Sequence, residues 1–260
     1  MVIVVCVKQV PIANNLKIDP KSKNLVRDNA EGVMNPFDRH AVEAALSLKE
    51  QVGGKIIAIS MGPEPFTDTL REAVALGCDE AFLLSSRAFA GADTLATAYV
   101  LAKAVEKLNP VDLVLLGRHA VDADTGQVGP LVAEFLNLPH VTLAQKLTLL
   151  SDQQMQVERL ADNYVETVMV KLPAIITATS ELNIPRYASP LRIMDAADMD
   201  IIVWDENYLQ CDANRIGVNG SPTVVTEVYM PPKPESNAQL LAVDPDTAGR
   251  EIAAILKTII

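Results

Sequence analysis

Residues 117–130 gather glycines, acidic side chains and a hydroxyl into one short segment. The segment reads Gly117-Arg118-His119-Ala120-Val121-Asp122-Ala123-Asp124-Thr125-Gly126-Gln127-Val128-Gly129-Pro130. Glycine lets backbone approach a ligand closely, and a helix predicted to begin near Thr125 would point free N–H groups at an anion. The pattern therefore indicates a candidate site for the phosphate of a nucleotide.

The two aspartates of this segment limit which part of a ligand can lie beside them. Asp122 and Asp124 would repel a bare phosphate and suit ribose hydroxyls or backbone donors better. An ordinary glycine-containing turn, with Asp124 or Thr125 as the helix N-cap, explains the same residues. The residues alone leave both interpretations open.

Four other loops are expected at the same edge of a sheet. They comprise residues 6–8, Asn35-Pro36-Phe37-Asp38, Ser60-Met61-Gly62-Pro63 and residues 87–94. Loops that follow parallel strands converge where open α/β sheets bind ligands, so a nucleotide pocket is expected there. Asn35-Pro36 is also a plain helix start, and Met61 is equally a core filler.

Motifs for covalent, metal or phosphate chemistry are missing from the sequence. It contains no Gly-x-Gly-x-x-Gly, Walker-type, Gly-x-Ser-x-Gly or Cys-x-x-Cys motif. His40 and Glu43 are three residues apart on a predicted helix, but such a pair is rarely a metal site. With no catalytic residue and no metal ligand predicted, the chain is interpreted as a binding or carrier module.

Composition limits the classes of partner that the chain is expected to bind. The chain has 260 residues, 49% of them hydrophobic, with a formal net charge of -11. An acidic chain repels nucleic acid and anionic lipid. Apolar runs stay shorter than the ~18 residues that a membrane span needs, and residues 2–7 fit a buried strand better than a secretion signal. The odd, widely spaced Cys6, Cys78 and Cys211 indicate a reducing compartment, so a cytoplasmic location is expected.

The elements that must position these loops follow from hydrophobic patterning. Short apolar runs at 2–7, 55–60, 81–84 and 111–116 alternate with helical stripes that begin near Pro36, Phe66, Asp93 and Thr125. This order predicts a mostly parallel, doubly wound α/β sheet of the Rossmann-like, adenine-nucleotide-binding type. About 30 residues separate the first strand from its helix, which is long for such a connection.

The pattern changes after Pro139. Runs at 146–150, 155–159, 165–170 and 174–179 predict a hairpin or meander added to the sheet. An irregular stretch covers 182–199. We expect an α/β domain over 1–210, then an extended arm from 211 and a terminal helix over 240–260 that pack on a partner chain.

Ordered segments along the chain resemble the β subunit of electron-transferring flavoproteins. The matching residues are Val5-Cys6-Val7-Lys8-Gln9-Val10-Pro11, Asn35-Pro36-Phe37-Asp38, Ser60-Met61-Gly62-Pro63, residues 116–129, Val157-Glu158-Arg159, Leu172-Pro173-Ala174, Leu182-Asn183-Ile184-Pro185-Arg186-Tyr187-Ala188 and Gly220-Ser221-Pro222-Thr223. Each piece is weak alone, but the ordered set is specific.

The resemblance implies a heterodimer with a larger α subunit that carries FAD. It implies AMP in the β-subunit pocket, or a second FAD in a subgroup that splits electron pairs from NADH. Residues 87–94 with Thr97, and 124–130, look like that subgroup, which favours FAD, with Arg87, Thr94 and Thr97 on the ring side. The expected cofactor-binding residues are Cys6, Val7, Lys8, Asn35, Phe37, Asp38, Met61, Gly62, Arg87, Thr94, Thr97, Gly117, Asp122, Ala123, Asp124, Thr125, Gly126, Gln127, Val128 and Gly129.

Residues 182–194 resemble the family's recognition loop, which docks on acyl-CoA dehydrogenases. Its expected partner-binding residues are Arg186, Tyr187, Leu191, Ile193 and Met194. The sequence departs from the family at Pro190-Leu191, where the usual order is reversed, and at Asp195-Ala196-Ala197-Asp198, which replaces a basic run. The departures leave open which dehydrogenase docks there. Packing of Leu191 on the sheet is an equal alternative to a role of Leu191 in docking.

Further redox partners and two rival functions follow from the same residues. The resemblance implies exchange with NADH and with ferredoxin or flavodoxin. A stand-alone adenine-nucleotide-binding regulator of the universal-stress type would explain the first ~140 residues but would leave the C-terminal part without a role. A nucleotide hydrolase is disfavoured by the missing phosphate-activating lysine and metal motifs.

Overall fold

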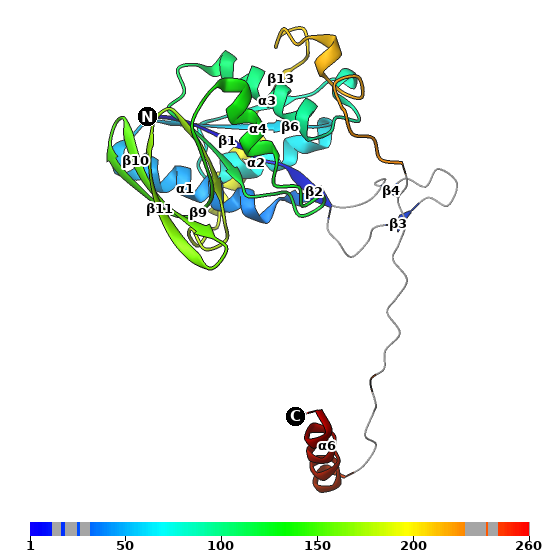
Figure 1. Cartoon of the computed structure of the whole chain (residues 1–260). Helices are drawn as coiled ribbons and strands as arrows, with labels where there is room; N and C mark the ends of the chain where they lie inside the picture. The colour runs from blue at the N-terminus through cyan, green and yellow to red at the C-terminus, as the bar shows by residue number, and fades with distance from the viewer. Residues whose placement is uncertain (12–16, 19–24, 27–31, 227–237, 239–243, 260) are drawn as a thin grey trace. The chain divides into compact units, whose positions relative to one another are not determined.

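A nine-stranded sheet forms the centre of the molecule. The computed structural model describes residues 1–11, 17–18, 25–26, 32–226, 238 and 244–259. The strand order is β11-β10-β9-β12-β8-β1-β6-β7-β13. The strands from β12 to β13 all pair in parallel, and the expected parallel, doubly wound sheet is confirmed (Figure 1).

Strict alternation of side chains gives the sheet two apolar faces. In β1 (Val2–Cys6), Ile3 and Val5 face one cluster, whereas Val4 and Cys6 face the other. The first cluster is covered by α1 (Pro36–Val52) and α2 (Thr67–Leu76), and the second by α3 (Thr94–Leu108) and α4 (Val128–Leu136). Burial on both faces explains why β1, β6 (Lys55–Met61), β7 (Glu80–Leu84) and β8 (Leu113–Gly117) are continuous apolar runs.

The predicted fourth helix begins later than expected. α4 starts at Val128 and not near Thr125. Asp124 and Gly126 have φ of 51° and 63°, so the chain is in the left-handed region that a right-handed helix cannot include. Residues 122–127 are therefore left as an exposed loop before the helix.

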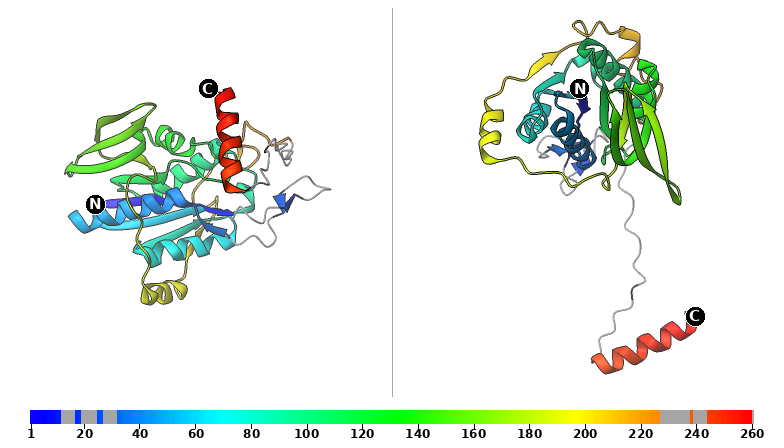
Figure 2. Two further views of the ribbon diagram at one scale, coloured as in Figure 1. Left: turned by 90° about the horizontal axis from the view of Figure 1, so that it is seen from below. Right: turned by 90° about the vertical axis from the view of Figure 1, so that its left-hand side faces the viewer.

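Three long strands extend one side of the sheet. β9 (His140–Ser151), β10 (Gln154–Ala161) and β11 (Tyr164–Lys171) pair antiparallel, which confirms the predicted addition (Figure 2). The fourth strand expected in this addition, β12 (Ala174–Ala178), instead lies between β8 and β9 and is parallel to both. Every residue of β12 is buried, so it belongs to the core of the parallel sheet.

The stretch expected to be irregular, residues 182–199, contains a helix, and a short strand follows it. α5 (Pro190–Ala197) begins at Ser189-Pro190, a typical helix start, and the Ser189 hydroxyl accepts a bond from the Arg192 N–H. β13 (Ile202–Trp204) then adds a short parallel edge strand beside β7. Neither element was predicted, because each is too short to show a periodic pattern.

The longest connection lies between β1 and α1. Its described parts contain β2 (Gln9–Pro11) paired with β5 (Gly32–Met34), and β3 (Lys17–Ile18) paired with β4 (Leu25–Val26). The β2–β5 pair returns the chain to the carboxyl end of β1, where α1 begins. The described parts of the long connection are thus paired strands, and the β2–β5 pair lies at that edge.

The chain divides into two compact units, residues 1–227 and 228–260. The first unit runs past the boundary expected at 210, because the Asp212 N–H donates to the Tyr99 hydroxyl and Thr223 donates to Asp93. Much of the expected arm, 227–237 and 239–243, lies outside the described residues. The second unit contains α6 (Pro245–Ile259), which confirms the terminal helix. In the described part of the chain, no helix is long and apolar enough to cross a membrane.

Candidate functional site

The carboxyl ends of β1 and β8 lie side by side, and the chain leaves them in opposite directions. After β1 it continues to β6, and after β8 it continues to β9 and β12 on the other side. Such a switch point opens a crevice between diverging loops, where doubly wound sheets bind their ligands. The loops after β1 and β8 contain Lys8 and residues 117–127.

A buried carboxylate joins these two loops. Asp38, in the first turn of α1, accepts the N–H of Lys8 at 2.8 Å and that of Gly117 at 3.0 Å. Burial raises the pKa of Asp38 to about 7, although hydrogen bonds from Asn35, Lys8 and Gly117 oppose that rise. Gly117 has no room for a side chain, since a Cβ there would lie 2.4 Å from Asp38 Oδ1.

Asn35 adds a second tie to the same loop. Its side-chain N–H donates to the His119 carbonyl at 2.8 Å, and its carbonyl oxygen accepts the Val121 N–H at 3.2 Å. It stands at the N-cap of α1, but its side chain makes no capping hydrogen bond to the backbone of the helix. The plain-cap interpretation therefore does not describe what this side chain binds.

Side-chain contacts at the surface hold the rest of the loop. Lys8 Nζ donates to both oxygens of Asp122, at 2.7 and 2.8 Å, and His119 Nδ1 lies 2.9 Å from Asp124 Oδ1. The Lys8 contact neutralises much of the negative charge that would oppose a phosphate. Thr94 at the start of α3 donates to the Gln127 side chain at 2.8 Å, which links another predicted site residue to this loop.

The start of α4 fits closely against the sheet. Gly129 is buried, and a Cβ there would lie 2.5 Å from Thr177 Cγ2 of β12. The first turn of a helix has N–H groups without partners in the helix, and here that turn adjoins the exposed residues 122–127. This edge offers backbone N–H donors together with exposed hydroxyl and amide groups, and buried side chains hold its loops in place. Such an arrangement fits a nucleotide with its phosphate at the start of α4.

The remaining predicted site residues surround this edge in different environments. Phe37 packs edge-on against the His119 ring at 4.5 Å, and the Arg118 guanidinium lies 5.0 Å from the Phe37 ring centre. Cys6 and Val7 are buried, and burial raises the pKa of the Cys6 thiol. Met61 ends β6, and the Gly62 N–H donates to the Leu84 carbonyl, which joins the ends of β6 and β7.

Arg87 faces a separate hollow. It lies in η3 (Arg87–Phe89) and lines a cavity of about 280 Å³ together with Ala213, Ile216 and Asn219. Thr97 is half-buried on α3. The structure therefore brings Thr94 to the 117–127 loop by a direct bond and places Arg87 beside the 213–219 segment.

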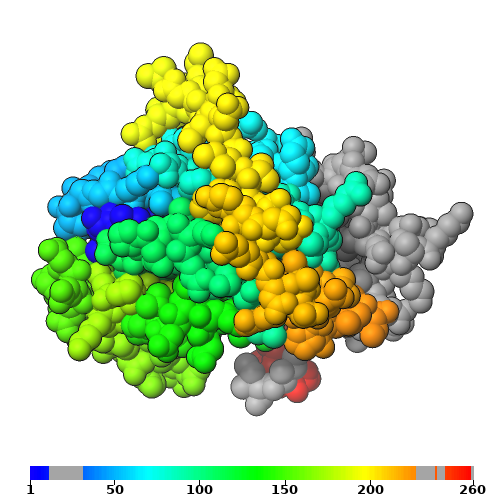
Figure 3. Space-filling model, turned by 90° about the horizontal axis from the view of Figure 1, so that it is seen from above, coloured from blue at the N-terminus to red at the C-terminus, as the bar shows by residue number. Residues whose placement is uncertain are grey.

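The predicted partner-binding residues lie on and before α5. Tyr187 is 93% exposed and Leu191 68% exposed, and Ile193 and Met194 are also exposed. The exposed Leu191 does not pack on the sheet, so that alternative is wrong. In the space-filling view, the yellow segment that contains α5 stands out from the body (Figure 3).

Arg186 differs from its neighbours because it is bound within the chain. Its guanidinium donates to Glu43 at 2.8 Å through both Nε and Nη2, and to Glu50 at 2.5 Å. Burial alone would raise the pKa of Glu43, but Arg186 holds it below its usual value. Sequence reasoning missed Glu50 as a functional residue, although its spacing of seven from Glu43 puts both on one helix face.

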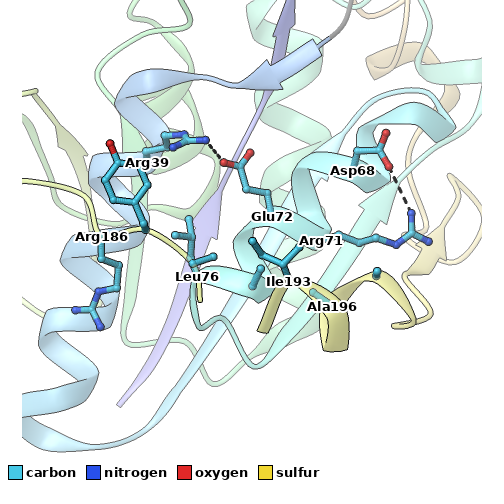
Figure 4. Close-up of a pocket in the computed structure, with 12 residues that line it drawn as sticks. Arg39, Asp68, Arg71, Glu72, Leu76, Arg186, Ile193 and Ala196 are labelled. Carbon is cyan, nitrogen blue, oxygen red and sulfur yellow. Dashed lines mark hydrogen bonds and ion pairs between the residues drawn. The ribbon is translucent and has the colours of Figure 1, made fainter. Parts of the chain in front are cut away.

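A groove of about 410 Å³ lies between α2 and α5. Leu76 and Ile193 line it, and the Arg39–Glu72 and Arg71–Asp68 ion pairs stand along it (Figure 4). The Arg192 side chain crosses to the Leu76 carbonyl at 3.2 Å and fixes α5 against the end of α2. Among the described side chains, no cluster of three metal-binding groups is found.

Comparison with known proteins shows the family of this chain. Residues 23–208 match the electron transfer flavoprotein domain family. The chain is 46% identical over 232 residues to an electron transfer flavoprotein subunit beta of Thermoanaerobacterium thermosaccharolyticum, covering 89% of this chain and 88% of that one. It is 43% identical over 233 residues to subunit CarD of the caffeyl-CoA reductase-Etf complex of Acetobacterium woodii, covering 89% and 88%.

Two other relatives extend the comparison. The electron transfer flavoprotein subunit beta of Megasphaera elsdenii is 38% identical over 267 residues, covering 100% of this chain and 98% of that one. Protein FixA of Azorhizobium caulinodans is 39% identical over 241 residues, covering 89% and 85%. The chain belongs to the electron transfer flavoprotein family, as a subunit of the beta type.

Proposed function

We propose that this chain is the nucleotide-holding subunit of a two-subunit electron carrier, with an FAD-carrying α subunit as its partner. The observation that carries the proposal is the switch point between β1 and β8, found in a chain that belongs to this family. A bound flavin supplies the redox chemistry, since amino-acid side chains do not carry an electron pair in this way. The chain itself binds and orients.

The ligand proposed for the β1/β8 edge is an adenine nucleotide. The loop 117–127 offers backbone donors and the Thr125 hydroxyl, and the Lys8–Asp122 pair lowers the repulsion of an anion. We favour a second FAD over AMP, with Arg87, Thr94 and Thr97 on the ring side. This choice rests on the resemblance of residues 87–94 and 124–130 to the two-FAD subgroup.

The redox partners proposed for the complex follow from the exposed apolar residues of α5. Leu191, Ile193 and Met194 form a surface suited to another protein, because exposed apolar side chains gain from burial in an interface. We propose an acyl-CoA dehydrogenase as the protein docked there. NADH as electron donor, ferredoxin or flavodoxin as acceptor, electron bifurcation and a cytoplasmic location stay predictions of the same proposal.

The experiment is a count of nucleotides in the purified complex. The chain is co-expressed with its α subunit, the complex is denatured, and FAD and AMP are quantified per heterodimer. Two FAD supports the proposal in full, and one FAD with one AMP replaces the second flavin by AMP. A complex with no adenine nucleotide beyond the FAD of the α subunit would contradict the pocket. The universal-stress regulator is disfavoured, since the family match extends to residue 208.

A further inference from the structure

Strands β1 and β8 are tied to each other at both ends by a carboxylate. At the amino end, the Asp112 carboxylate accepts the Val2 N–H at 2.7 Å. At the carboxyl end, Asp38 accepts the N–H groups of Lys8 and Gly117. The two ties are chemically alike, but only Asp38 lies at the edge where a ligand is proposed.

Asp38 and Asn35 are too deeply buried to face a ligand with their side chains. Asn35 is 1% exposed and Asp38 is 6% exposed. Their polar atoms are already bonded to the backbone of Lys8, Gly117, His119 and Val121. Each side chain therefore bonds the backbone of residues 117–121 from the buried side of the loop, which is a different role from contact with the nucleotide.

The two residues act from a rigid base. Both belong to the start of α1, where the Asn35 N–H donates to the Lys8 carbonyl and the Asp38 N–H donates to the Asn35 carbonyl. α1 packs on β1, β6, β8 and β12, so it cannot shift without disturbing the core. A loop bonded to this helix turn is held in one conformation before any ligand arrives.

We propose that Asp38 and Asn35 are positioning residues, which hold the loop after β8 in the conformation that binds the nucleotide. The inference rests on the proposed function, because it assigns the support of that same site. Pre-ordering the loop removes an entropic cost from binding, so loss of either tie weakens affinity without removing a contact to the ligand.

The charge of Asp38 gives this role a pH signature. An ionised carboxylate accepts a hydrogen bond from both N–H groups. In the protonated acid, one oxygen carries a proton, which competes with an N–H group for the same position. The titratable and charged groups around it are Cys6 on β1, Lys8 after β1, and Arg118, His119 and Asp122 on the loop. Lys8 is held by Asp122, so it does not bond Asp38 through its side chain.

The test compares Asp38→Asn with Asp112→Asn in the nucleotide-stripped complex with the α subunit. AMP and FAD affinities are measured by titration calorimetry between pH 6 and pH 8.5. We expect Asp38→Asn to bind about tenfold more weakly than the unaltered complex at pH 8.5. The ratio should shrink toward one at pH 6, where Asp38 becomes neutral. Ionisation of the AMP phosphate is common to all the proteins and cancels in the ratio.

Asp112→Asn is the matched control, because it weakens a tie between the same two strands at the opposite edge. It should keep the unaltered affinity and pH profile. Asn35→Ala provides a second variant in case Asp38→Asn does not fold. It should weaken both ligands to a similar extent and shift the pH profile to higher pH, because the hydrogen bond from Asn35 lowers the pKa of Asp38.

Two results would overturn the inference. One is an affinity of Asp38→Asn and Asn35→Ala equal to that of the unaltered complex. The other is an equal loss in Asp112→Asn, which would reduce the effect to general stability. Failure of the unaltered complex to bind either nucleotide contradicts the proposed function itself, and so is distinguished from failure of the positioning role.

Discussion

Asp38 is the residue whose chemistry depends most on its surroundings. A carboxylate in water ionises near pH 4, but burial raises the pKa of Asp38 to about 7. Its bonds to two backbone N–H groups offset only part of the cost of removing charge from water. The folded chain therefore holds the neutral form of Asp38 more readily than the unfolded chain does.

The pH dependence of stability follows from this difference. Because the folded pKa is the higher one, the stabilising contribution of Asp38 is complete below about pH 4 and is lost as pH rises to about 7. Relative to Asp38→Asn, which does not titrate, the nucleotide-free complex should lose about 1.4 kcal/mol per pH unit across that window. Urea unfolding of both proteins from pH 5 to pH 8 measures it. A constant difference would show that Asp38 titrates normally.

At the scale of elements, α1 contacts both the proposed nucleotide site and the proposed partner-binding segment. Its first turn bonds the 117–121 segment, while Glu43 and Glu50 on the following turns bond Arg186 within residues 182–194, the segment that resembles the family's recognition loop. His40 adds a further bond, with Nδ1 3.0 Å from the Asn183 carbonyl. One helix packed on the sheet therefore fixes both the loop proposed to bind a nucleotide and the start of the segment proposed to bind a partner.

Arg186→Gln should loosen the recognition loop and leave the nucleotide site unchanged. The substitution leaves the buried Glu43 without its countercharge, and an unpaired buried charge is destabilising. Hydrogen exchange of residues 184–199 should become about tenfold faster. The nucleotide content per heterodimer should not change.

Leu191→Ala is the comparison for that variant. It removes an exposed side chain with no internal ion pair, so exchange should stay as it is while electron transfer to the proposed dehydrogenase partner slows. Equal exchange rates in Arg186→Gln and Leu191→Ala would show that the Glu43–Arg186 pair does not hold the loop.

At the scale of the whole molecule, residues 1–227 carry their own core. Among the described residues, the buried apolar side chains all fall between Ile3 and Ile216, and α6 contributes none. On α6, Ile252, Ile255 and Leu256 are exposed and share one face at helical spacing. Such a face gains stability only when another surface covers it, and a partner chain is the surface that the sequence predicts for it.

Removal of residues 228–260 should separate folding from assembly. The shortened chain should keep the thermal midpoint of its own unfolding within about 3 °C, since no part of the core is lost. Its recovery with a tagged α subunit should fall sharply, measured by co-purification. Full recovery would exclude α6 from the interface between the subunits.

The sequence by itself determined the parallel sheet and the loops at its carboxyl edge. Local hydrophobic periodicity indicates buried strands and amphipathic helices, so β1, β6, β7, β8 and the first three helices could be predicted. The resemblance to the family was likewise visible in ordered loop residues. Short α5 and β13 could not be predicted, because few residues carry little periodic signal.

Only the tertiary structure decided what the loop residues bind. Asn35 looks like a helix cap and Arg186 like a partner contact, yet one bonds His119 and Val121 and the other bonds Glu43 and Glu50. These partners are 84 to 143 residues away in the chain. Local sequence sets which groups a residue offers, but the meeting of distant strands and helices sets which of those groups it uses.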